Sequence, residues 1–323
     1  MVESPVLVVG ASGFVGRHVC VALAATGHEV RRATSQRNRV TETEGGAWVH
    51  LDVNDVKTFA RALEGCRKVI YLYHGLGSGN DYPMREANAA IGFRNAAIGA
   101  GIERLVYLGG VVPTGLRSQH LDSRRATGEI FRDGPLLALE LRAAMIIGKG
   151  SVSFNLMRDL AARAPVLALP PWLDQGSWPI AIDDVVYALV RALDVSLQTS
   201  AWFELPGPEW VTHRDLITRL AAILGTRVFS RRFSWLSPAL SSRLLGVIGR
   251  EPYPVVAELV AGLPCDLTPS GTSFWTGLGE TARRPLVAAM LDALADETST
   301  REPSLATEER LIQRLGKPLG ATT

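Results

Sequence analysis

The sequence is poor in the residues that would mark several classes of protein. It has three cysteines in 323 residues, far apart along the chain, so neither a disulfide framework nor a zinc site is indicated. No run approaches the roughly 18 apolar residues of a membrane span. The opening "MVESPVLVVG" lacks the basic start of a secretory signal. These absences predict a cytoplasmic protein without a membrane partner.

An excess of one charge is also missing. Lys and Arg number 34 against 32 Asp and Glu, and 47% of the residues are hydrophobic. This balance argues against a basic nucleic-acid-binding surface and against a disordered, solvating chain. The expected partners are a small-molecule substrate and further copies of the chain, as in a homodimer, with no nucleic acid.

The first 150 residues alternate short apolar runs with helical patterns that end in glycine. Repeated strand–helix–strand order predicts an α/β fold with a doubly wound parallel sheet of the Rossmann type. The expected strands are 5–10, 28–34, 47–53, 68–73, 104–110 and 137–147, with helices at 16–27, 55–65 and 84–101.

After residue 150 the pattern loosens, and prolines interrupt the helical segments. We therefore expect a nucleotide-binding domain at 1–150, to which 178–195 returns, a small, mostly helical substrate lid at 151–295, and a polar tail at 296–323. Several aromatic side chains of the lid either line a pocket or belong to the core, namely Trp172, Trp178, Trp235, Phe274 and Trp275.

A glycine-rich turn, "VLVVGASGFVGRHV", joins the first strand to the first helix. Gly10 permits a tight turn, Gly13 lets the backbone approach a pyrophosphate, and Gly16 lets the helix pack closely on the strand. The free amides and positive end of such a helix hold an anion. The predicted pyrophosphate site comprises Gly10, Ser12, Gly13, Phe14, Val15 and Gly16.

The ends of the next strands predict the rest of the cofactor site. An acid after the second strand would bind the ribose of NAD, whereas this strand runs into "SQRNR", so Ser35 and Arg37 favour NADP(H) over NAD. A solvated basic loop is the alternative. Asp52 follows the third strand and either reaches the adenine or caps the next helix. Tyr73 and His74 end the fourth strand, at the edge where nicotinamide or substrate is expected.

Taken together, these motifs resemble the extended and atypical short-chain dehydrogenases/reductases, including NmrA-like and epimerase-like proteins. The resemblance covers about residues 5–210 and rests on the order of "GASGFVG", "LDVND", "GIERLVYLGG", "LRAAMIIGKGS", "WPIAIDDVVYALVRAL" and "FELPGPE". It implies a nicotinamide cofactor and the Rossmann fold. It gives the fold with more certainty than the substrate.

Catalytic members of this family use a Ser or Thr after the fifth strand and a Tyr and a Lys four residues apart on the next helix. Here Gly109 and Gly110 stand where the hydroxyl is expected, and the Tyr–Lys spacing falls on His120 and Arg124. His120 titrates near neutral pH when unperturbed and would replace the tyrosine acid, with Arg124 on the ribose. Ser123 would orient a carbonyl. The alternative is a plain helix start from which the catalytic set has been lost.

Two further residues leave both a functional and an ordinary interpretation open. Tyr82 closes over the site or is a surface tyrosine, and Lys149 lies near substrate or in a solvated loop.

The sequence thus favours an NADP(H)-dependent oxidoreductase that acts on a small, hydrophobic or aromatic carbonyl, alcohol or alkene. A non-catalytic NADP-binding sensor or assembly protein and an epimerase or dehydratase are the alternatives, because fold alone does not decide function.

Overall fold

The structure is a computed structural model. It describes residues 4–40, 47–79, 81–113, 118–163, 166–169, 171–226, 229–232, 252–265, 267–279 and 282–298. Trp235 and most of the predicted tail, from residue 299 onward, lie outside these residues.

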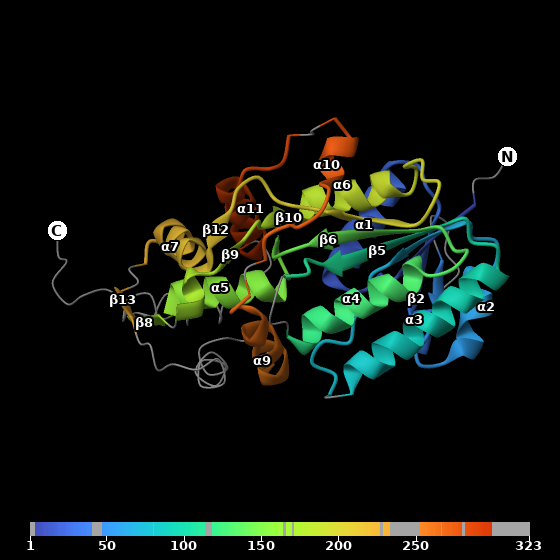
Figure 1. Ribbon diagram of the computed structural model, residues 1–323, viewed down its shortest axis with the longest axis horizontal. Helices are drawn as coiled ribbons and strands as arrows, with labels where there is room; N and C mark the ends of the chain where they lie inside the picture. Colours follow the sequence, from blue (N-terminus) through green and yellow to red (C-terminus); the bar gives the residue numbers. More distant parts are fainter. Residues whose placement is uncertain are drawn as a thin grey trace.

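A seven-stranded sheet forms the centre of the molecule, and all its strands are parallel (Figure 1). In spatial order they are β11 (Ala201–Glu204), β6 (Ala138–Ala143), β5 (Arg104–Gly110), β4 (Lys68–Tyr71), β1 (Val6–Val9), β2 (Val30–Thr34) and β3 (Trp48–His50). The strand order reverses between β1 and β4. Ligands of open α/β sheets bind in the crevice at the carboxyl ends of the strands beside such a switch point. The predicted Rossmann-type fold is confirmed.

The last strand predicted in the first half of the chain, 137–147, is in fact two strands. β6 ends at Ala143, and β7 (Ile146–Ile147) pairs with β10 (Ile180–Ala181) outside the main sheet. The Ile180 amide donates to the Met145 carbonyl oxygen at 2.9 Å, which fixes the point where the chain leaves the sheet. The mainly apolar segment 137–147 gave no sign of this break, because apolar residues continue from the end of β6 through β7.

Two helical layers cover the sheet. α1 (Phe14–Ala25) and α6 (Ile182–Ala192) pack together on one face, while α3 (Tyr82–Gly99) and α4 (Gln119–Arg132) pack together on the other, with α2 (Phe59–Leu63) beside α3 (Figure 1). Alternate strand residues serve the two cores, as period-two side-chain geometry requires. Thus Val6 and Val8 face α1 and α6, whereas Leu7 and Val9 face the α3 side.

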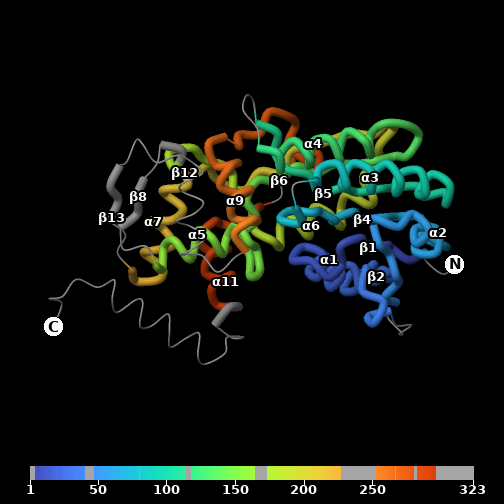
Figure 2. Tube along the Cα trace, turned by 90° about the horizontal axis from the view of Figure 1, so that it is seen from below, coloured from blue at the N-terminus to red at the C-terminus, as the bar shows by residue number. Residues whose placement is uncertain are grey.

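The C-terminal part of the chain has a third apolar core and is mainly helical. Figure 2 shows it beside the sheet and its flanking helices. Its helices are α5 (Val152–Arg163), α7 (His213–Leu224), α9 (Tyr253–Gly262), α10 (Phe274–Gly277) and α11 (Leu286–Thr298). Two small sheets join β8 (Val166–Leu169) to β13 (Phe229–Arg232) and β9 (Gly176–Ser177) to β12 (Val211–Thr212). α9 contacts α4, which brings the helical part against the sheet domain.

Helices α7 and α10 begin as their sequences indicate. Thr212 caps α7 by accepting a hydrogen bond from the Asp215 amide at 3.0 Å. Phe274 and Trp275 of α10 are buried in the core with α6, so the pocket-lining alternative for these two aromatic residues is wrong. Among the described helices, none combines the length and the apolar character needed to cross a bilayer.

The aromatic cluster under α3 yields a stability prediction. Tyr71 is buried among Phe93, Tyr107 and Phe131, and its hydroxyl has no hydrogen-bond partner among the described residues. The Tyr107 hydroxyl donates to the Arg124 carbonyl oxygen at 3.3 Å. Tyr71→Phe should leave the free energy of unfolding unchanged or raise it by up to about 1 kcal/mol, whereas Tyr107→Phe should lower it by about 1 kcal/mol. Urea denaturation of both variants tests this, and equal losses would contradict it.

Candidate active site

The glycine turn after β1 has the geometry that the sequence predicts. Gly10 adopts a φ of +84°, which favours glycine over any other residue. A Cβ on Gly16 would collide with the Gly10 carbonyl oxygen and lie 2.8 Å from the Ala11 Cα. Glycine is therefore required at both positions for the turn to form and for α1 to approach it.

The start of α1 fits an anionic group. Gly13 is the N-cap and supplies no side-chain hydrogen bond, so the first amides of the helix, at Phe14, Val15 and Gly16, have no side-chain cap. Ser12 and Gly13 are exposed beside them. An exposed helix start without a cap suits the pyrophosphate of a dinucleotide.

The ends of β2 and β3 place the other predicted cofactor residues at the same edge. Ser35 directly follows β2 and is exposed, as is Arg37, which opens a 3-10 helix. Asp52 follows β3 and accepts from the Asn54 amide at 3.0 Å. The alternative that Asp52 caps the next helix is wrong, because Asp55 caps it by accepting from Lys57.

The segment after β4 lies against the glycine turn. A Cβ built on Gly10 would be 3.1 Å from the Leu72 carbonyl carbon and 3.2 Å from the Tyr73 amide nitrogen. Tyr73 is partly buried, and burial raises the pKa of its phenol. The structure thus brings Tyr73 and His74 beside the predicted pyrophosphate site.

Helix α4 carries the three predicted catalytic residues but turns them in different directions. Ser118 caps the helix by accepting from the Leu121 amide at 3.3 Å, so the residues do stand at a helix start. His120 lines a cavity. Ser123 instead donates to the Glu86 carboxylate, and Arg124 donates to the Leu108 carbonyl oxygen. Ser123 and Arg124 are buried and do not line that cavity.

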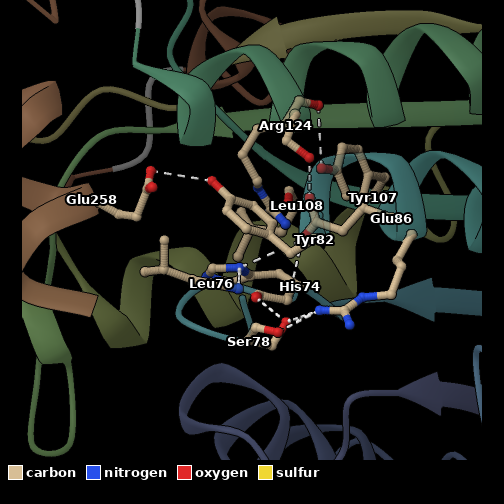
Figure 3. Close-up of polar contacts among 12 residues, drawn as sticks. His74, Leu76, Ser78, Tyr82, Glu86, Tyr107, Leu108, Arg124 and Glu258 are labelled. Atoms are coloured by element: carbon tan, nitrogen blue, oxygen red, sulfur yellow. Dashed lines mark hydrogen bonds and ion pairs between the residues drawn. The ribbon is translucent and has the colours of Figure 1, made fainter. Parts of the chain in front are cut away.

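Glu86 of α3 is the buried centre of this site. Its carboxylate accepts from Ser123 and from the Gly75 amide, the latter at 2.5 Å. Burial alone would raise the pKa of the Glu86 carboxyl, but its contacts with His74 and Ser123 lower it. Together with the Gly75 amide and the charge of Arg124, these contacts bring the pKa to about 2. Glu86 is thus an anion that ties the loop after β4 to α4 (Figure 3).

The rings of His74 and His120 face each other at a centroid distance of 5.3 Å. His74 Nδ1 lies 3.1 Å from the Leu76 amide nitrogen and 3.6 Å from Oε1 of Glu86. Burial lowers the pKa of His74, although its side chain is 33% exposed.

In the fold, the pKa of His120 departs from its unperturbed value near neutral pH. Burial, the neighbouring His74 and the charge of Arg124 lower the pKa of His120 to about 3. Its Nδ1 is buried and has no hydrogen-bond partner among the described residues. His120 is therefore a neutral imidazole that can form a hydrogen bond with a ligand. It does not carry the additional proton that an imidazolium acid would donate.

The cavity beside His120 has a volume of about 110 Å³ and lies where the sheet meets the helical part. Gly110 at the end of β5 and Ala143 at the end of β6 form one wall. Most of the other described lining residues are aliphatic, and they include Leu121, Met145, Leu156, Met157, Leu259, Leu263 and Leu267. Its polar residues are His120, Ser153, Ser177, His213 and Glu258.

The two glycines at the expected serine position differ in their surroundings. A Cβ on Gly109 would lie 2.6 Å from Oε1 of Glu140, a buried residue that pairs with Arg132 and Arg142. A Cβ on Gly110 would make only ordinary contacts, with Leu121 at 3.8 Å. Glu140 therefore occupies the space that a side chain at Gly109 would need.

Two residues of the site were misjudged or missed from the sequence. Tyr82 is neither exposed nor in a loop, because it is buried at the start of α3 and donates to Glu258 of α9 at 3.3 Å (Figure 3). Glu86 was missed, although it falls in the buried stripe of α3 with Tyr82 and Phe93. Lys149 lies elsewhere, in an open groove with Arg17 and other residues of α1 and α6.

Comparison with known proteins agrees with this geometry. Residues 10–132 match the protein family described as NAD(P)H-binding. The chain is similar to the structure of MoeE5 in complex with UDP-glucuronic acid and NAD, at 17% identity and a TM-score of 0.70, over 92% of this chain and 100% of that one. No curated protein matches it significantly.

Two other solved structures are similar. One is TunA, an NAD-dependent NDP-hexosamine 5,6-dehydratase of tunicamycin biosynthesis, at 17% identity and a TM-score of 0.67, over 92% of this chain and 98% of that one. The other is a short-chain dehydrogenase/reductase superfamily protein from Agrobacterium tumefaciens with bound NAD, at 18% identity and a TM-score of 0.67, over 95% and 99%.

The family match thus begins at the glycine turn and ends within α4. The chain shares its Rossmann-type fold with these solved structures, one of which is a short-chain dehydrogenase/reductase superfamily protein.

The close approach at Gly16 gives a test of the cofactor site. Gly16→Ala should weaken NAD(P)H binding more than tenfold and lower the free energy of unfolding by about 1–3 kcal/mol, because backbone must move to admit the methyl group. Gly99→Ala is the control, since a Cβ there meets nothing within 4 Å and should be neutral or slightly stabilising. Fluorescence titration and thermal unfolding measure both effects. Unchanged nucleotide binding by Gly16→Ala would contradict the assignment.

The lowered pKa of His120 gives a prediction for stability against pH. Below about pH 6.5 the unfolded chain binds a proton at this histidine that the folded chain does not, so folding stability falls as the pH falls toward 3. His120→Gln removes this contribution. Between pH 7 and 5 the variant should lose about 2 kcal/mol less unfolding free energy than the wild type.

Urea denaturation across that pH range measures the difference, with His28→Gln as a control at a histidine outside the site. Glu86 contributes in the same direction only between about pH 4.5 and 2, below this window. Parallel curves for wild type and His120→Gln would show that His120 is not buried as described.

Proposed function

We propose that this protein is an NADP(H)-dependent oxidoreductase of the atypical short-chain dehydrogenase/reductase type. Its substrate is a small, mainly apolar carbonyl, alcohol or alkene. The observation that carries the proposal is the aliphatic cavity, which opens beside His120 at the carboxyl ends of β5 and β6. In open α/β folds this edge is where ligands bind.

The cavity suits hydride chemistry for a physical reason. Its aliphatic walls exclude water and leave few polar groups to fix the orientation of a substrate. A bound nicotinamide cofactor supplies or accepts the hydride. The protein then contributes mainly by holding the reactants in position.

We assign His120 the task of binding the reacting oxygen of the substrate. As a neutral imidazole it donates or accepts one hydrogen bond without adding a charge to the apolar cavity. A neutral histidine that polarises a carbonyl by hydrogen bonding is an established catalytic arrangement. Ser123 and Arg124 have a positioning role, because they fix Glu86 and α4 behind His120.

Support for NADP(H) over NAD(H) comes from the end of β2. Exposed Ser35 and Arg37 stand at the edge where the adenosine ribose is expected, and the residues that directly follow the strand, 35–39, include no acid. A guanidinium there offers a bidentate partner for a 2′-phosphate.

An epimerase or dehydratase acting with bound NAD is the second candidate. Similar folds are seen in MoeE5 with a UDP-sugar and in the dehydratase TunA. Nucleotide-sugar chemistry is less well supported here, because the described lining of the cavity contains no Lys or Arg to pair with a diphosphate. The third candidate is a sensor that binds the cofactor and catalyses no reaction.

The first experiment is a calorimetric titration with NADPH and with NADH. Arg37→Ala should weaken NADPH binding about tenfold or more and leave NADH binding unchanged. Only NADPH has a 2′-phosphate, and the variant lacks the guanidinium that would bind it. Arg61→Ala is the control, an exposed arginine on α2. It should bind both nucleotides like the wild type.

Each result decides between the candidates. Tighter binding of NADH than of NADPH would overturn the NADP(H) assignment. No binding of either nucleotide in the millimolar range would overturn the oxidoreductase proposal. Nucleotide binding without turnover of any small ketone, enone or alcohol, in wild type and His120→Gln alike, would favour the sensor.

A further inference from the structure

One charged residue stands in the described wall of the cavity. Glu258, from α9, lies among the aliphatic residues that close the cavity opposite the sheet. The polar residues that share this wall are two serines and two histidines. His120 is neutral, because its pKa is lowered to about 3. Within the described lining, Glu258 is the one acidic side chain, and no Lys or Arg stands beside it.

Glu258, which is partly buried, differs from three carboxylates that are fully buried and lie near a cation. Glu140 pairs with Arg132 and Arg142, and Asp159 pairs with Arg158. Glu86 likewise has the charge of Arg124 beside it.

Within the described part of the chain, the partner of Glu258 is a neutral one, the Tyr82 hydroxyl, which donates to Oε2 at 3.3 Å (Figure 3). This hydrogen bond comes from a neutral group and leaves the charge of the carboxylate uncompensated. A carboxylate facing an apolar space is stabilised by a cation that enters that space.

We infer that the cavity takes a small, mainly aliphatic cation, an amine or an iminium, with Glu258 as its counter-ion. The inference rests on the proposed hydride transfer at this site and adds a cationic substrate class to the neutral ones proposed above. Aliphatic walls bind the hydrocarbon part, and the carboxylate binds the nitrogen.

This substrate class also accounts for the departure from the family's catalytic set. Reduction of a ketone needs a proton for the developing alkoxide, and this is the task of the tyrosine that is absent here. An iminium ion needs none. A hydride from NAD(P)H forms the new C–H bond, the C=N π electrons become the nitrogen lone pair, and the products are a neutral amine and NAD(P)⁺. Because His120 is uncharged, it does not repel the cation.

The test begins with binding, which does not depend on turnover. In the complex with NADPH, 2-methylpyrrolidinium and the neutral 2-methylcyclopentanone are titrated by calorimetry. The wild type should bind the cation at least tenfold more tightly than the ketone. Glu258→Gln should remove most of this preference while keeping the affinity for the ketone within about threefold.

Two control variants separate charge from packing. Tyr82→Phe removes the hydrogen bond but keeps the carboxylate, so the preference for the cation should remain. Glu209→Gln removes a surface carboxylate that pairs with Arg219 and should behave like the wild type. If Tyr82→Phe lost the preference as fully as Glu258→Gln, the effect would come from lid packing, and the inference would be overturned.

Turnover gives the second readout. N,2-dimethyl-1-pyrrolinium is the probe, because its charge does not change with pH. Its kcat/KM should fall at least tenfold in Glu258→Gln, with little change for the ketone. Failure to bind NADPH would overturn the proposed function itself. NADPH binding and ketone reduction with no preference for either cation would overturn the inference alone.

Discussion

The site depends on one buried interaction, the anchoring of the Glu86 carboxylate. Hydrogen bonds from Ser123 and from the Gly75 amide join helix α3, helix α4 and the loop that follows β4. The loop and α3 are consecutive in the chain, whereas Ser123 of α4 is 37 residues from Glu86. A buried carboxylate is tolerated only when such partners replace its water. The positions of His74 and His120 therefore follow from satisfying Glu86.

Three separate apolar cores hold the strands and helices around Glu86 in place. Strand residues alternate between the α1–α6 core and the α3–α4 core, and the third core unites α5, α7, α9 and α11. The cavity lies where the third core meets the strand ends. Its wall thus combines rigid sheet positions, such as Gly110, with helical positions from the C-terminal part, such as Glu258.

The sequence was informative wherever a local pattern determines structure. Apolar runs predicted the main strands, and the glycine spacing predicted the turn at Gly10 and Gly16, because both depend on neighbouring residues. The site residues were harder to predict. Glu86 gave a signal as an acid in a buried helical stripe, yet its partner Ser123 is 37 residues away. The neutrality of His120 depends on burial by segments that no sequence pattern brings together.

Glu140 makes several positions interdependent. A Cβ built on Gly109 or on Gly128 would lie 2.6 Å from Oε1 of Glu140. The Glu140 carboxylate also pairs with Arg132 and Arg142. A side chain at either glycine therefore requires the Glu140 carboxylate to move, which would disturb its pairing with the two arginines. Redesign toward a hydroxyl-based site has one open route, through Gly110. Conversion by stepwise substitution at Gly109 would pass through poorly folded intermediates.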